Sequence, residues 1–317
     1  MSRLLKIEGS APRKPLAERR RATDAQRSFE ILGNPPDKDT NGDVIGFTPY
    51  FTTQFGLPHR PVKGNEWVRQ NGVDTLRVIN YSRQGIPFGS LPRIILAWVA
   101  TWQVRHPSAT VIELGKNLSR FMEDELQLPR TGRYIKDVKK QLKCLFTCIV
   151  SVTTDDVTRD HFDAEGKQIA RRIVLWGNPA HSDQDALWES YIILTDEFRE
   201  SLLENPVPID TRAFPLLTGS PLAVDYYLYF ARTMFSLRKS RLVTWAQLHA
   251  QFGSSYNFTD KYARNNFRAE SRKQITTRVR NAYPTLRVHF DQENKGIWLH
   301  PSPTPVPASP KRVYSHS

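Results

Sequence analysis

The amino-acid sequence predicts an α+β fold with two winged-helix domains in tandem, each a helix-turn-helix followed by a β-hairpin wing. The main observation is that one order of elements occurs twice: an apolar helix, a short strand, two more helices and a hairpin. Both ends of the chain lack this periodicity, which predicts disordered tails, basic at the N-terminus and Pro-rich at the C-terminus. The expected divisions are a tail over 1–43, a first domain over 44–205, a second over 206–300 and a tail over 301–317.

Length and composition agree with this division and restrict the function. The chain has 317 residues, enough for about two domains of ordinary size. It carries 45 Lys and Arg against 32 Asp and Glu, a net charge of +13, which makes nucleic acid the first partner to test. The longest apolar run, Ile94 to Val104, is too short to cross a bilayer, and two cysteines cannot form a disulfide framework. We therefore expect a cytoplasmic protein without a membrane partner.

The first set of elements begins at Ser90, which we expect to cap an apolar helix with Pro92 in its first turn. Pro129 and Gly132 separate the next two helices. A turn from Asp163 to Lys167 is expected at the tip of the hairpin. The predicted elements are a helix over 90–105, a strand over 110–113, helices over 116–126 and 132–146, and β segments over 149–154, 168–176 and 191–194.

The second set begins at Ser220, again a cap followed by proline. Thr244 and Gln247 have the spacing of a capping box, and Gly253 is expected to end the helix that they start. A long polar helix follows and is stopped by Pro284. The predicted elements are a helix from 220, a strand at 242–243, helices over 244–252 and 259–282, and a hairpin over 285–290 and 297–300.

The third helix of the second set is the candidate DNA-reading helix, because this helix normally enters the major groove in winged-helix proteins. Between Asp260 and Ala282 it has seven Lys or Arg residues against two acidic residues. Arginine and asparagine can form paired hydrogen bonds with base edges. The alternative is a solvated basic helix without a ligand. The expected DNA-binding residues are Lys261, Arg264, Asn265, Arg268, Arg272 and Lys273, on the first turns of this helix.

The third helix of the first set has a similar basic face, opposite an apolar stripe that includes Val138 and Leu142. Lysine, a flexible point charge, is suited to phosphate, whereas the rigid fork of arginine is suited to bases. We therefore expect the first domain to hold the DNA backbone and the second to read sequence. The candidates on this helix are Arg133, Lys136, Lys140 and Lys143.

The sequence offers no credible catalytic, cofactor or metal site. No phosphate-binding loop occurs, and Cys144 and Cys148 lack the second ligand pair that zinc requires. Tyr226 and Tyr227 have the chemistry of a nicking nucleophile, but a buried tyrosine pair is the favoured interpretation. We expect no enzymatic activity.

Several long and unusual segments of the sequence resemble the plasmid-encoded RepA replication initiator family. The resemblance covers about residues 45–290 and includes a block at 50–72 whose role is open: it either packs against the first domain or contacts a partner. The matching segments are Tyr50–Gly72, Phe88–Trp98, Leu142–Phe146, Pro206–Asp210, Ser220–Asp225 and Trp245–Ser255.

This resemblance implies a bacterial plasmid initiator that binds repeated double-stranded DNA sequences at the origin and recruits host replication initiator and helicase proteins. Two alternatives remain: a repressor or copy-number regulator that binds its own promoter, and a nicking-type replication enzyme. The apolar helix with Trp98 and Trp102 also predicts a homodimer contact, unless the segment 44–80 covers it.

Overall fold

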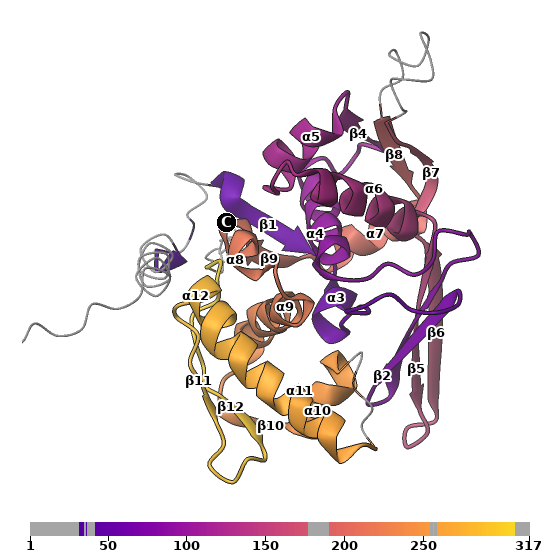
Figure 1. Ribbon diagram of the computed structural model, residues 1–317. Helices are drawn as coiled ribbons and strands as arrows, with labels where there is room; N and C mark the ends of the chain where they lie inside the picture. The colour runs from indigo at the N-terminus through magenta and orange to yellow at the C-terminus, as the bar shows by residue number, and fades with distance from the viewer. Residues whose placement is uncertain are drawn as a thin grey trace, which may run out of the picture.

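The computed structural model describes residues 32–34, 36, 42–176, 190–253, 256 and 259–307 (Figure 1). It has a mixed α/β fold in which two long apolar helices, α4 (Ser90–Arg105) and α9 (Pro221–Ser236), pack against each other. The described strands form four antiparallel sheets around these helices. Most of both predicted tails lies outside the described residues. Among the described helices, none is both long and apolar enough to cross a membrane.

Helix α4 is the centre of the first half, as the sequence predicts, and most of its residues are buried. It packs against β1 (Ile45–Thr48), α6 (Gly132–Phe146) and α7 (Asp196–Glu204) as well as α9. Its start differs from the prediction. Gly89, with a φ of 80°, occupies the N-cap position without a side-chain hydrogen bond, and Ser90 is already inside the helix.

The next elements follow the predicted order. Strand β4 (Val111–Gly115) leads to α5 (Leu118–Arg120), which continues into a π-helical turn at Phe121–Glu125. The side chain of Thr131 accepts a hydrogen bond from the Tyr134 amide and caps α6. The helix α6 has the residue bounds that the sequence predicts.

The hairpin after α6 has a different turn from the one expected. Strands β5 (Ile149–Asp156) and β6 (His161–Gln168) pair from Ile149 opposite Gln168 to Asp156 opposite His161, so the turn lies at 157–160 and 163–167 belongs to β6. The Asp156 carboxylate accepts hydrogen bonds from the amide and hydroxyl of Thr158, a typical turn interaction. Asp160 takes a left-handed conformation, with φ at 50°.

The first half contains a four-stranded and a three-stranded sheet instead of the single hairpin that was expected. The other edge of β5 pairs with β3 (Asp74–Ile79), which pairs with β2 (Glu66–Asn71). Strand β4 instead pairs with β8 (Ser190–Leu194), and β8 pairs with β7 (Ala170–Val174). The segments 149–154 and 168–176, expected in one hairpin, therefore lie mainly in two different sheets.

The second half follows the predicted order closely. Ser220 caps α9 through its side chain, and Thr244 with Gln247 forms the expected capping box. Strands β10, β12 and β11 form one antiparallel sheet in that order. The elements are β10 (Arg241–Thr244), α10 (Trp245–Phe252), α11 (Lys261–Gln274), a π-helical turn at Ile275–Val279, α12 (Arg280–Ala282), β11 (Val288–Phe290) and β12 (Gly296–Leu299).

The N-terminal block lies between the two halves and contacts both of them. Strand β1 pairs with β9 (Val207–Asp210) and packs on α4, while α3 (Tyr50–Gln54) packs on α9. Strand β2 also contacts α10. This placement answers the question left open for residues 50–72 in part, because the block packs against the first half and the second half together.

The Pro-rich segment at the C-terminus is ordered where the structure describes it. The Tyr283 hydroxyl donates a hydrogen bond to the Pro303 carbonyl at 2.5 Å, and Val306 is buried. The expectation of a disordered tail is therefore wrong for residues 301–307. Proline excludes helix here, but it does not prevent packing of an extended segment.

Candidate nucleic-acid interface

Helix α11 is anchored to the protein along one side. The Asp260 carboxylate caps its start by accepting hydrogen bonds from the Tyr262 and Ala263 amides at 3.0 and 3.1 Å. Phe267 is buried, and the Tyr226 hydroxyl donates to the buried Ser271 hydroxyl at 2.8 Å. Because one face is held in this way, the opposite face of the same turns is presented to solvent.

None of the six candidate residues of α11 is fully buried. Lys261, Asn265 and Lys273 are exposed, and the other three are half-buried. Within the described part of the chain, Arg268 has neither a hydrogen-bond nor an ion-pair partner, whereas Lys273 lies 3.8 Å from Glu270. Arg268 therefore keeps its donors available for a ligand.

Arg272 has a structural role that the sequence did not reveal. Its guanidinium donates a hydrogen bond to the Asn294 side chain at 2.9 Å and lies 4.5 Å from the centre of the Phe290 ring. It also lies 5.5 Å from the centre of the Trp245 ring. Arg272 thus connects α11 to the hairpin and to α10, so its loss affects folding as well as any contact with DNA.

The cations beyond Gln274 are used inside the protein. The helix continues as a π-helical turn over Ile275–Val279, and both of these residues are fully buried. Arg278 donates to the Leu216 carbonyl at 2.9 Å, and Arg280 donates to the Val288 carbonyl at 2.7 Å. The candidate interface is therefore confined to the N-terminal turns of α11.

Tyr262 is a further candidate, not among those predicted from the sequence. This side chain is 79% exposed on the first turn of α11, beside Lys261. An exposed aromatic ring can stack on a base or donate a hydrogen bond to phosphate. The sequence feature that could have indicated it is an aromatic residue between cations at the start of a predicted DNA-reading helix.

Helix α6 presents its expected basic face. Arg133, Lys136, Lys140 and Lys143 are all exposed, while Val138 and Leu142 are fully buried on the other side. Two of these cations have contacts within the protein: Arg133 lies 4.0 Å from Asp137, and Lys140 lies 5.1 Å from the centre of the Phe88 ring. Lys139, at the margin, donates to the Trp176 carbonyl at 2.7 Å.

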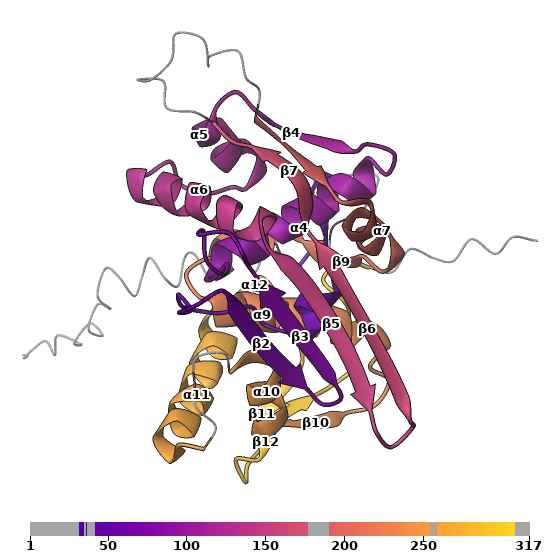
Figure 2. The ribbon, with the colours of Figure 1, turned by 90° about the vertical axis from the view of Figure 1, so that its right-hand side faces the viewer.

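The two basic helices lie on the same side of the molecule. Both face the viewer in Figure 1, and both form the left-hand border of the protein when the view is turned by 90° in Figure 2. The sequence could not predict this relation, because it depends on how the two halves pack.

The hairpin tips, by contrast, are not basic. In the second hairpin, the Asp291 carboxylate accepts hydrogen bonds from the Lys295 amide and the Trp298 indole, and these bonds hold its pKa below the usual value. Lys295 is also paired with Glu293. In the first half, Arg159 of the turn lies 3.5 Å from Asp156, and Lys167, farther along β6, lies 2.6 Å from Glu165. Neither hairpin offers a strong phosphate contact at these positions.

Tyr226 and Tyr227 belong to the core, as the sequence analysis favoured. Both are fully buried, and burial raises the pKa of each phenol above its usual value. The Tyr227 hydroxyl donates to the Asp210 carbonyl at 3.0 Å. Neither hydroxyl is placed to reach a DNA strand.

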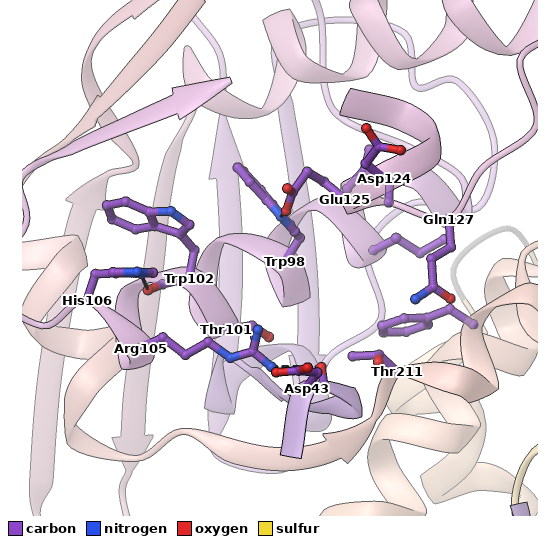
Figure 3. Close-up of a pocket in the computed structure, with 13 residues that line it drawn as sticks. Asp43, Trp98, Thr101, Trp102, Arg105, His106, Asp124, Glu125, Gln127 and Thr211 are labelled. Carbon is purple, nitrogen blue, oxygen red and sulfur yellow. Dashed lines mark hydrogen bonds between the residues drawn. The ribbon is translucent and has the colours of Figure 1, made fainter. Parts of the chain in front are cut away.

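Trp98 and Trp102 line a cavity of about 350 Å³ beside α4 (Figure 3). The Trp98 indole donates to the Glu125 carboxylate at 2.8 Å, and Arg105 donates to the backbone carbonyl of Asp43 at 2.8 Å. Strand β1 covers a neighbouring face of α4 through hydrogen bonds between Phe47 and Thr101. The segment 44–80 therefore covers part of the surface from which a dimer contact was expected.

Among the described residues, no group of three or more His, Cys, Asp or Glu side chains is placed to hold a metal ion.

Comparisons with known proteins place the chain in a family. Two crystal structures of domains 2 and 3 of RctB are similar to it, each with 11% sequence identity and 80% of its own chain covered. They cover 69% and 70% of this chain with TM-scores of 0.46 and 0.45. No curated protein matches in sequence. A family model described as plasmid encoded RepA protein matches residues 86–247, just over half of the chain, which includes α4, α6 and α9 but not α11. The chain belongs to this family of plasmid encoded RepA proteins.

Proposed function

We propose that this protein is a replication initiator of a bacterial plasmid, acts in the cytoplasm, and binds repeated double-stranded DNA sequences at the plasmid origin. The observation that carries the proposal is the placement of two basic helices, α6 and α11, on one side of a protein with a net charge of +13. Membership of the plasmid encoded RepA family supports the same role.

The second half is the winged-helix domain that reads the DNA sequence. Its helices α9, α10 and α11 precede the hairpin β11–β12, and the short strand β10 completes the sheet beside that hairpin. In a winged helix with this order, the third helix inserts into the major groove. Arg264, Asn265 and Arg268 then face base edges, because they lie on the first turns of α11.

The first half is the winged-helix domain that holds the DNA backbone. Helix α6 has three exposed lysines and one exposed arginine, a composition suited to phosphate. Its wing is the hairpin β5–β6, enlarged into a four-stranded sheet by β2 and β3. With both helices on one duplex, host initiator and helicase proteins are recruited to the faces that DNA leaves open.

A footprint on the DNA that flanks the gene tests this proposal. An initiator protects several evenly phased repeats, whereas one protected palindrome over a promoter supports the alternative of a repressor or copy-number regulator. Incubation of the supercoiled origin plasmid with protein and Mg²⁺ tests the nicking alternative, because a covalent protein–DNA adduct would overturn the non-enzymatic role. A duplex of the same composition with shuffled sequence is the control for specificity.

A further inference from the structure

A buried ion pair joins α4 in one half to α9 in the other. Arg93 on α4 and Asp225 on α9 are each about 1% exposed. The Arg93 guanidinium donates two parallel hydrogen bonds to the carboxylate, Nε to Oδ1 at 2.5 Å and Nη2 to Oδ2 at 2.8 Å. Such a paired geometry fixes both distance and angle between the two groups.

The N-terminal block completes this network. The His59 imidazole lies with Nε2 at 3.0 Å from Asp225 Oδ2, and Arg93 donates to the carbonyls of Leu57 and Gly89, each at 2.6 Å. Gly56 fits against the carboxylate so closely that an added Cβ would lie 2.6 Å from Oδ2. Three segments far apart in the sequence therefore meet at one carboxylate.

The contacts of Asp225 and His59 determine which of these groups is charged. Burial by itself would raise the pKa of Asp225, but Arg93 and the His59 hydrogen bond hold that pKa below its usual value. Burial lowers the pKa of His59, so the imidazole is neutral and donates its Nε2 proton to the carboxylate. The other cation near this junction is Arg69, which donates to the His249 carbonyl and whose pKa burial lowers to about 10.

Hydrogen bonds continue from the network to both basic helices. On one side, Gln141 of α6 accepts a hydrogen bond from the Phe88 amide at 3.0 Å, and Phe88 precedes Gly89, which holds Arg93. On the other side, Tyr226 follows Asp225 and donates to Ser271 of α11 at 2.8 Å. The ion pair is therefore the central link in a path of hydrogen bonds and chain neighbours from α6 to α11.

A buried ion pair is a poor source of stability but a demanding geometric constraint. Desolvation offsets most of its attraction, and apolar residues of similar size would often serve stability equally well. Apolar contacts, however, tolerate sliding of one helix along another, whereas a paired arginine–carboxylate contact does not.

We propose that the network of Arg93, Asp225 and His59 is a positioning element that fixes the relative placement of α6 and α11. It thereby sets the spacing between the two DNA segments that one protein molecule can bind. This inference rests on the proposed function for its DNA consequence only, since the placement of the helices is measurable without DNA.

Two variants loosen the junction by different means. Asp225→Asn keeps the shape of the side chain but removes its charge, and Gly56→Ala keeps every charge but inserts a methyl group against Oδ2. The matched control is Asp210→Asn, because Asp210 is also buried and paired with arginine, but its partner Arg212 is two residues away and no second helix is involved.

The first measurement is the distance between spin labels on Lys136→Cys of α6 and Lys261→Cys of α11, in full-length protein without DNA. The buried residues Cys144 and Cys148 are replaced by alanine in all samples. The expected result is a narrow distribution in the parent and in Asp210→Asn, and a distribution at least twice as wide in Asp225→Asn and Gly56→Ala. Unchanged widths in variants that melt cooperatively would overturn the inference.

The second measurement is binding to a footprinted repeat into which one to five base pairs are inserted between the segments facing α6 and α11. Each base pair rotates the second segment by about 35°, so two or three move it off the common face. The parent should lose tenfold or more in affinity with such insertions, and the loosened variants less than threefold. The variants should bind a short duplex carrying only the α11 segment as the parent does.

These two measurements separate the inference from the proposed function. If the parent binds no DNA but the label distances broaden as expected, the initiator role fails and the positioning role stands. If DNA binding is specific but the loosened variants keep the parent's spacing profile, the positioning role fails alone.

Discussion

Replacement of Arg268 by alanine tests whether α11 reads DNA sequence. A bidentate contact between arginine and guanine contributes about 1–3 kcal/mol of discrimination, which corresponds to a loss of about 5-fold to 150-fold in affinity for the cognate repeat. Random DNA offers the same phosphates but not the same base. The affinity of the variant for random DNA should therefore fall much less than its affinity for the cognate repeat. The ratio of cognate to random affinity should therefore collapse.

The structure indicates that Arg268→Ala should change DNA binding without changing the stability of the fold. Arg268 is half-buried and, within the described residues, has no hydrogen-bond or ion-pair partner whose loss would destabilise the fold. The anchors of α11, Phe267 and Ser271, are unchanged. The free energy of unfolding should stay within about 0.5 kcal/mol of the parent, as is usual for surface substitutions. Thermal melting checks this before any binding result is interpreted.

Lys136→Ala on α6 is the matched comparison, because its side chain is exposed and belongs to the helix expected to hold phosphate. It should weaken cognate and random binding alike and reduce the slope of log affinity against log salt by about 1. Fluorescence anisotropy with a cognate and a shuffled duplex, at several salt concentrations, measures both effects. Equal losses for Arg268→Ala on both duplexes, together with lost specificity for Lys136→Ala, would show that the reading helix is assigned to the wrong half.

Three further predictions concern salt, folding and pH. Affinity for DNA should fall with a log–log salt slope of about −6 or steeper, and a slope near zero would refute the electrostatic role of both helices. Arg272→Ala should lower the free energy of unfolding by about 1–2 kcal/mol in a denaturant titration, because it loses the Asn294 hydrogen bond and the Phe290 ring contact; an unchanged midpoint would contradict this. The melting temperature should fall as pH drops below about 6.5, since the unfolded chain binds a proton at His59 that the folded protein, with its lowered pKa, does not. His59→Gln should remove that part of the pH dependence.

The elements most successfully predicted from the sequence are those with strong local signals. The capping box of Thr244 and Gln247, the cap at Ser220 and the apolar stripe of α6 each involve residues a few positions apart, and each is confirmed. Local hydrogen bonds and helical periodicity depend on nearby sequence alone. The second half also follows the predicted order closely, although its strand β10 pairs with the distant β12, Thr244 lying opposite Gly296.

The misplaced features depend on distant partners. Strand β5 pairs with β3, about 75 residues earlier, and this pairing draws the hairpin into a larger sheet. The turn at 157–160 was missed because 163–167 contains glycine, whereas the pairing register puts that stretch inside β6. The contact between Arg93 and Asp225 was equally hidden, since 132 residues separate them. Strand pairing and buried ion pairs are set by tertiary packing, which overrides local turn preference.

The structure also divides the cations into two groups that composition cannot distinguish. Arg93, Arg272, Arg278 and Arg280 donate to internal carbonyls or side chains and hold elements together. The second group is the cations of the candidate interface, which lie on the exposed side of α6 and on the first turns of α11. A charge excess over a whole chain therefore indicates a polyanionic partner. It overstates the number of residues that contact this partner, because some of the cations are used inside the protein. The extent of contact follows from which guanidinium and ammonium groups the fold leaves available. The two helices that carry the candidate residues, α6 and α11, lie along one side of the protein (Figure 2).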